Sequence, residues 1–167
     1  MRIPSRAEVD AFCGSPSTRW QRVLGILAPA LLLGSIVFIL IRWPHLPEQI
    51  PSHYNFAGEV DGYSGRGMLL LMPILGLVMD AVIALAGRFP KSWNTGAKIT
   101  LFNRARVYRL VRDLMAELRL AGALFFAGFG VYQSLLPEHF SGNILGILTL
   151  LFFVPIVRYF VRLAKKG

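Results

Sequence analysis

Cysteine is almost absent from this chain, since Cys13 is the only one among 167 residues. A single thiol excludes an internal disulfide and a cysteine-based metal cage. Charged side chains are also scarce, at 16% of residues against roughly a quarter in typical soluble domains. Acidic residues are the rarer kind, with 9 Asp and Glu against 18 Lys and Arg. This low charge, beside 54% hydrophobic residues, favours a protein whose solvent is partly lipid.

Sequence motifs for common chemistry are missing as well. The chain has no phosphate-binding glycine loop, nucleophile elbow or zincin motif. We therefore expect no cofactor, and a non-enzymatic protein is favoured over an enzyme. The net charge of +9 would suit nucleic acid, but the position of the charges favours orientation in a membrane, so no nucleic-acid partner is expected.

Four apolar runs are each long enough to cross a bilayer, which takes about 20 residues. They lie at residues 23–41, 68–87, 120–136 and 140–157. Because they are apolar on all sides rather than along one stripe, they predict membrane helices and not a soluble bundle. The first run is too long for the apolar part of a signal peptide and indicates a retained helix. The expected fold is all-α, an integral membrane four-helix bundle forming a single domain over residues 1–167.

Basic residues are distributed unevenly between the flanks of these runs. Sixteen of the 18 lie in the N-terminal stretch, in residues 88–119 or in the C-terminal tail. The positive-inside rule assigns these segments to the cytoplasm, so both termini are predicted inside and residues 43–67 form a structured external loop. Within 88–119, apolar residues after Thr100 recur at helical spacing. They predict an amphipathic helix that lies at the inner surface or extends the third span into the cytoplasm, and whose basic face would engage a protein partner.

The external loop carries a long and irregular motif. Residues 46–63 read L-P-x-x-I-P-x-H-x-N-x-x-G-x-x-D-G-Y, and a basic residue, Arg66, follows. This resembles the domain of unknown function at the N-terminus of SdpI-type (SDP toxin) immunity proteins, over about residues 20–135. The resemblance implies a bacterial plasma-membrane protein that confers resistance to a secreted toxic peptide and recruits a cytoplasmic repressor. The external loop would then sense a ligand or peptide.

Four polar residues of this loop are candidates for binding: His53, Asn55, Asp61 and Arg66. In a functional interpretation, the imidazole and the carboxylate bind a ligand or a metal ion. In a structural interpretation, Asn55 and Asp61 hydrogen-bond the backbone of glycine-containing turns. A metal site at His53 and Asp61 is the least favoured functional interpretation, because one histidine with one or two carboxylates supplies few ligands for a metal ion. The other two interpretations stay open.

Asp80 lies within the second apolar run, where an ionised group at a helix centre costs about 2.5–3.5 kcal/mol on insertion. Gly76 and Ala84 share its helix face, so a neighbouring helix can approach closely. Asp80 is either a relay in a small ion-coupled transporter or a structural contact between helices. Transport would require a homo-oligomer, because four spans enclose little room. An immunity or signalling protein is preferred, with the transporter as the alternative.

Overall fold

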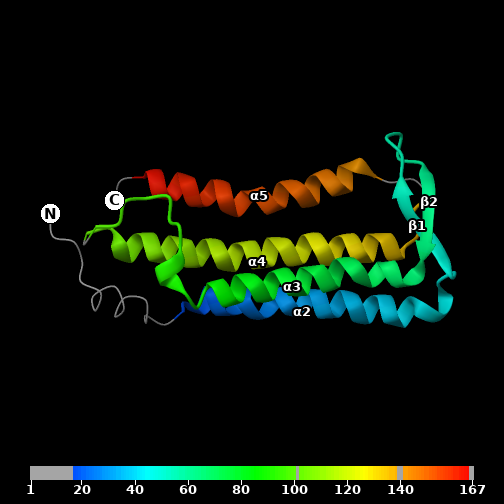
Figure 1. Cartoon of the computed structure of the whole chain (residues 1–167), viewed down its shortest axis with the longest axis horizontal. Coiled ribbons are helices and arrows are strands. Elements are labelled where there is room, and N and C mark those ends of the chain that lie inside the picture. Colours follow the sequence, from blue (N-terminus) through cyan, green and yellow to red (C-terminus); the bar gives the residue numbers. More distant parts are fainter. Residues whose placement is uncertain (1–16, 101, 139–140, 166–167) are drawn as a thin grey trace.

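The computed structural model describes residues 17–100, 102–138 and 141–165, so Cys13 and Phe140, the predicted start of the last span, lie outside it. Four long helices stand side by side and alternate in direction (Figure 1). They are α2 (Arg19–Arg42), α3 (Leu71–Ala86), α4 (Arg104–Ser134) and α5 (Gly142–Ala164). The short 3₁₀ helices are η1 (Trp43–His45), η2 (Arg66–Leu70) and η3 (Pro90–Ser92).

A β-hairpin lies between α2 and α3, and it corrects the all-α prediction. Its strands β1 (Gln49–Tyr54) and β2 (Val60–Gly65) pair antiparallel across one end of the bundle (Figure 1). Pro51 stands within β1, although proline cannot donate a hydrogen bond to a ladder. A two-stranded sheet tolerates it, since each strand has only one partner. We call this end of the molecule the hairpin end.

The opposite end, where the described chain begins and finishes, contains the α3–α4 connection and most of the arginines (Figure 1). We call it the basic end. At this end α2 begins with a capping box, in which Thr18 and Gln21 each accept a hydrogen bond from the other's backbone N–H. Of the two arrangements expected for the amphipathic helix, the structure has the one in which it extends the third span. It is the first half of α4, whose 31 residues extend about 46 Å, longer than the roughly 30 Å apolar thickness of a bilayer.

Small residues bring the helices together around α4, which contacts each of the other three. Ala28 and Ala123 are fully buried in the core cluster. A Cβ added at Gly76 would lie 2.4 Å from a Leu32 methyl and 2.8 Å from the Phe126 Cβ. Such close approach is what small residues permit between membrane helices. The bundle is therefore held by close backbone packing rather than by large interlocking side chains.

Large apolar side chains cover the outside of the bundle. Examples are Ile26 on α2, Val82 on α3 and Leu150 on α5, each at least 60% exposed. Soluble monomers rarely expose apolar surface on this scale. All four helices, α3 counted together with η2, are long and apolar enough to cross a membrane. These properties agree with the four predicted spans.

Candidate functional site

The hairpin is attached to the bundle on two sides. Ile50 of β1 is 2% exposed and packs with Ile39 of α2 and Leu69 of η2. The Tyr54 hydroxyl donates to the Gln133 Oε1 of α4 at 3.3 Å and to the Pro137 carbonyl at 3.1 Å. Burial raises the pKa of Tyr54, with smaller contributions from two neighbouring tyrosines, so the hydroxyl remains a protonated donor at neutral pH. The hairpin is thus fixed to the bundle.

Arg66 belongs to this attachment and not to the exposed surface of the hairpin. Its Nη1 donates to the carbonyls of Trp43 and Leu46, both at 3.3 Å. The guanidinium also lies 5.0 Å from the centre of the Trp43 ring, within the range of a cation–π contact. Arg66 therefore connects the end of the hairpin to η1, away from the other three loop candidates.

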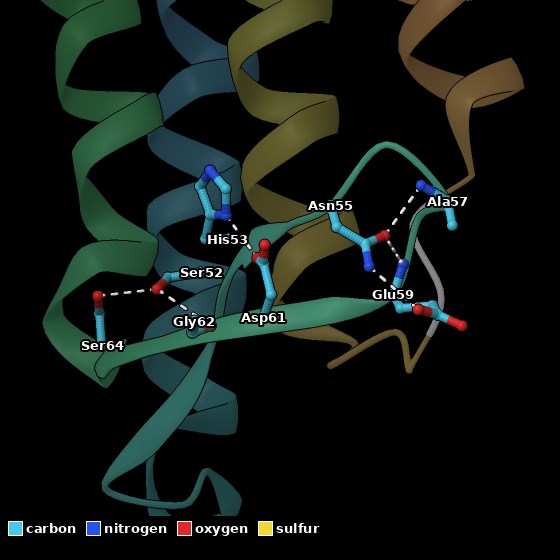
Figure 2. A network of polar contacts seen from close by, with 8 residues as sticks. All are labelled: Ser52, His53, Asn55, Ala57, Glu59, Asp61, Gly62 and Ser64. Carbon is cyan, nitrogen blue, oxygen red and sulfur yellow. Dashed lines mark hydrogen bonds and ion pairs between the residues drawn. The ribbon is translucent and has the colours of Figure 1, made fainter.

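Asn55 organises the turn between the strands (Figure 2). Its Oδ1 accepts hydrogen bonds from the backbone N–H groups of Ala57 at 2.9 Å and Glu59 at 3.0 Å. Its Nδ2 donates to the Glu59 carboxylate at 3.0 Å. Gly58 supplies the positive φ of 81° that the turn requires. Asn55 thus holds the loop backbone, as its structural interpretation expects.

His53 and Asp61 are the two loop candidates that meet. The His53 Nδ1 lies 2.5 Å from the Asp61 Oδ1 across the strands, and the side chains are 73% and 42% exposed (Figure 2). Gly62 stands opposite His53, where an added Cβ would lie 2.9 Å from the His53 Cβ. Among the residues that the structure describes, no group of three His, Cys, Asp or Glu is placed to hold a metal ion. The pair offers one imidazole and one carboxylate to solvent.

Two aromatic side chains that sequence reasoning did not single out are exposed on the hairpin. Phe56, in the turn, is fully exposed, and Tyr63 of β2 is 64% exposed. An exposed phenylalanine on a loop that is otherwise fixed by hydrogen bonds presents apolar surface with little freedom to withdraw it. Tyr63 stands in the loop motif, but the sequence does not indicate that either side chain is exposed, because exposure of an aromatic residue depends on the fold around it.

Asp80 has a partner that the sequence analysis missed. Arg119 of α4 donates to both carboxylate oxygens of Asp80, from Nε at 2.7 Å and from Nη2 at 2.9 Å. The same Nη2 donates to the Gly25 carbonyl of α2 at 3.0 Å. Asp80 itself is 6% exposed. A two-pronged ion pair between the buried Asp80 and the half-buried Arg119 therefore joins α2, α3 and α4, which agrees with the structural interpretation of Asp80.

The acidic residues of α4 also have cationic or amide partners. Gln21 of α2 donates to Asp113 at 2.8 Å, and Arg162 of α5 lies 3.5 Å from the second oxygen of Asp113. Arg158 of α5 lies 3.2 Å from Glu117. Among the described residues, the carboxylates of the basic end are thus paired within the bundle, and the excess positive charge there comes from the remaining arginines and lysines.

Comparison with known proteins identifies one domain. Residues 30–77 match the family described as Domain of unknown function (DUF1648). The match spans the second half of α2, the hairpin and the start of α3, and it confirms the resemblance to a domain of unknown function. An uncharacterized protein of Archaeoglobus fulgidus is 27% identical over 146 residues, covering 80% of this chain and 76% of the relative. No solved structure matches the chain.

Proposed function

We propose that the protein is a multi-pass membrane protein without enzymatic activity, whose hairpin faces outward and binds a peptide. Both termini and the α3–α4 connection lie in the cytoplasm, where the basic surface engages a protein partner. The partition of the lysines and arginines supports this orientation, because all but two of the 18 fall at one end. By resemblance, the peptide is a secreted toxin against which the protein gives immunity.

The observation that carries the proposal is the combination of attachment and exposure in the hairpin. Ile50 and Tyr54 fix β1 to the bundle, while Phe56 and Tyr63 remain exposed. Aromatic side chains give large contact areas, and a preorganised loop loses little conformational entropy when it binds. A peptide with apolar side chains fits such a surface. A peptide seated there would also reach His53 and Asp61, which offer it hydrogen bonds.

The transporter alternative receives less support from the geometry. A proton or cation relay at Asp80 requires the carboxylate to exchange partners. Both oxygens of Asp80 are held by the guanidinium of Arg119, and Arg119 is anchored to Gly25 as well. Transport would have to break this pair in each cycle, at the cost of leaving two charges unpaired in an apolar bundle.

Survival of cells exposed to the toxin tests the peptide-binding function. A toxin-sensitive strain expressing the chain should survive concentrations of the SDP peptide that kill the strain carrying an empty vector. Phe56→Ser combined with Tyr63→Ser should abolish most of this protection at unchanged membrane abundance. Phe102→Ser is the matched control, because Phe102 is 90% exposed at the opposite end of the molecule. Absence of protection by the unaltered chain would exclude immunity, and equal loss in the control would exclude the hairpin surface.

Labelling of single cysteines tests the orientation. Cys13 is the natural chain's only thiol, so Cys13→Ser gives a background without cysteine. In that background Ala57→Cys places a thiol in the hairpin turn and Phe102→Cys places one at the basic end. A membrane-impermeant maleimide applied to intact cells should label the first and spare the second. The reverse pattern would overturn the orientation but leave the four-helix fold intact.

A further inference from the structure

A cavity of about 490 Å³ opens at the basic end between α2, α3 and α4. Four arginines line it: Arg22 of α2, Arg88 after α3, and Arg112 and Arg119 of α4. None of the described residues that line this cavity is acidic. It is therefore a hollow with cationic walls, and it lies at the opposite end of the molecule from the hairpin.

Two of these arginines have no neutralising partner among the residues that the structure describes. Arg119 is paired with Asp80, whose carboxylate neutralises its charge. Arg22 and Arg88 are exposed, and neither side chain has a hydrogen bond or ion pair with another residue in the described part of the chain. An anion entering the cavity would meet both guanidinium groups without displacing a carboxylate. Guanidinium groups are well suited to phosphate, because their N–H donors match its oxygens.

The inner wall of the cavity has a different character. Ala84 of α3, Gly87 directly after α3 and Gly25 of α2 leave space, and Ile83 and Met115 supply apolar atoms. Beside the opening, the outer faces of α2 and α3 are apolar, with Val23 and Leu85 both exposed. The cavity thus combines cationic groups at its edge with an apolar wall that continues onto the membrane-facing surface. A free anion needs only the first feature, whereas a phospholipid needs both.

We propose that this cavity binds the phosphate headgroup of an anionic membrane lipid from the leaflet next to the basic end. Arg22 and Arg88 hold the phosphate, and an acyl chain follows the apolar wall toward the exposed faces of α2 and α3. The site belongs to the other end of the molecule from the peptide-binding hairpin, so either proposal can fail while the other stands.

Native mass spectrometry of the delipidated, full-length protein tests the site, with phosphatidylglycerol and phosphatidylcholine titrated separately. Phosphatidylglycerol should bind at least tenfold more tightly. Arg22→Gln combined with Arg88→Gln should weaken phosphatidylglycerol binding roughly 10- to 30-fold, from the usual contribution of two basic residues near a lipid surface. The matched control is Lys98→Gln with Arg109→Gln, which removes the same charge from exposed positions at the same end but outside the cavity. It should bind within about twofold of the unaltered protein.

Filling the cavity separates a specific site from general attraction. Ala84→Leu keeps every arginine but occupies the space beside the apolar wall, so it should weaken phosphatidylglycerol binding while the melting temperature stays unchanged. Inorganic phosphate at millimolar concentration should not displace the lipid. Displacement by phosphate would instead identify a free-anion site and overturn the lipid proposal. Equal binding of the two lipids, or equal loss in the control pair, would overturn it too.

Discussion

The two ends of the molecule satisfy their polar groups in opposite ways. Within the hairpin the partners are close in sequence: His53 and Asp61 are 8 residues apart, and Asn55 and Glu59 are 4 apart. The exception is the Tyr54 hydroxyl, which joins the hairpin to Gln133, 79 residues away. At the basic end they are distant: Asp80 and Arg119 are 39 residues apart, and Gln21 and Asp113 are 92 apart. Local bonds shape one projecting element, whereas distant bonds decide how helices stand against one another.

This difference indicates that the two ends have separate roles, one in presenting a surface and one in assembling the bundle. A change in the local bonds of the hairpin should alter the surface offered to a ligand and leave the bundle assembled. A change in the distant bonds of the basic end should loosen the bundle itself. The comparison can be tested by removing one polar partner at a time and asking whether the bundle or only the hairpin responds.

The largest effect is expected for Asp80→Ala, which leaves the half-buried Arg119 without its carboxylate. Breaking one partner of a buried ion pair typically costs about 3–5 kcal/mol, because the remaining charge is uncompensated. The free energy of unfolding, measured by denaturing-detergent titration of the protein in mild detergent micelles, should fall by that amount. A variant that removes both charges tests whether this loss of stability comes from the unpaired charge.

The double variant Asp80→Leu with Arg119→Met replaces both charges by apolar groups of similar size. Because no charge remains unpaired, this variant should be far closer to the unaltered protein than Asp80→Ala is. If the single and double variants lose the same stability, the pair is not what holds α3 to α4. If the double variant is stable and still conducts ions in proteoliposomes, any transport does not use Asp80.

A smaller effect is expected for Tyr54→Phe, which removes the hydroxyl that joins β1 to Gln133 and Pro137. The loss should be about 1 kcal/mol, in the usual range for a hydrogen bond. It should appear as faster amide exchange in the hairpin, with the exchange of the helices unchanged. Equal acceleration in the helices would contradict the separation of the two ends.

The same residue predicts a dependence on pH. Burial raises the pKa of Tyr54 in the folded protein above its usual value near 10. A raised pKa means that the folded state holds the proton more tightly, so this contribution is complete at neutral pH and is lost as the pH rises above about 10. Hairpin protection should therefore decline in alkaline solution, and Tyr54→Phe should remove that decline. A change in hairpin protection near pH 7 would have to come from another group.

Much of the helical framework could be predicted from the sequence, because a bilayer imposes one strong requirement on every span. Length and lack of charge identify all four helices without knowledge of their neighbours. The third span, predicted at residues 120–136, corresponds to the second half of α4, which runs from Arg104 to Ser134. Its first half is amphipathic, and hydropathy alone does not show that an amphipathic segment and an apolar one form a single helix.

The partners of the polar residues could not be predicted in the same way. Arg119 was counted only as a flanking cation, because it directly precedes the third apolar run. Asp80 lies two turns inside the inner end of α3, so the two residues stand at similar depth once the helices are antiparallel. Depth matching would have been a usable signal. The register that brings His53 opposite Gly62 had no comparable signal, because the irregular pairing depends on a glycine whose missing Cβ leaves room.

The smallest effect on stability is expected at the exposed pair of the hairpin, His53 and Asp61. Both side chains are substantially exposed, and exposed ion pairs contribute at most about 1 kcal/mol. His53→Ala and Asp61→Asn should each leave hairpin amide exchange within a few fold of the unaltered protein. Gly62→Ala is the contrasting variant, because its added methyl would press on the His53 Cβ and disturb the strand pairing itself.

These three variants decide between the structural and the binding interpretation of the pair. If His53→Ala and Asp61→Asn keep the hairpin ordered and still abolish protection against the peptide, the pair contacts the ligand. If both keep protection while Gly62→Ala abolishes it, the strand geometry is what the ligand needs, and the exposed aromatic residues carry the contact. If His53→Ala disorders the hairpin as strongly as Gly62→Ala, then even an exposed local bond is structural, and the contrast drawn between the two ends is too sharp.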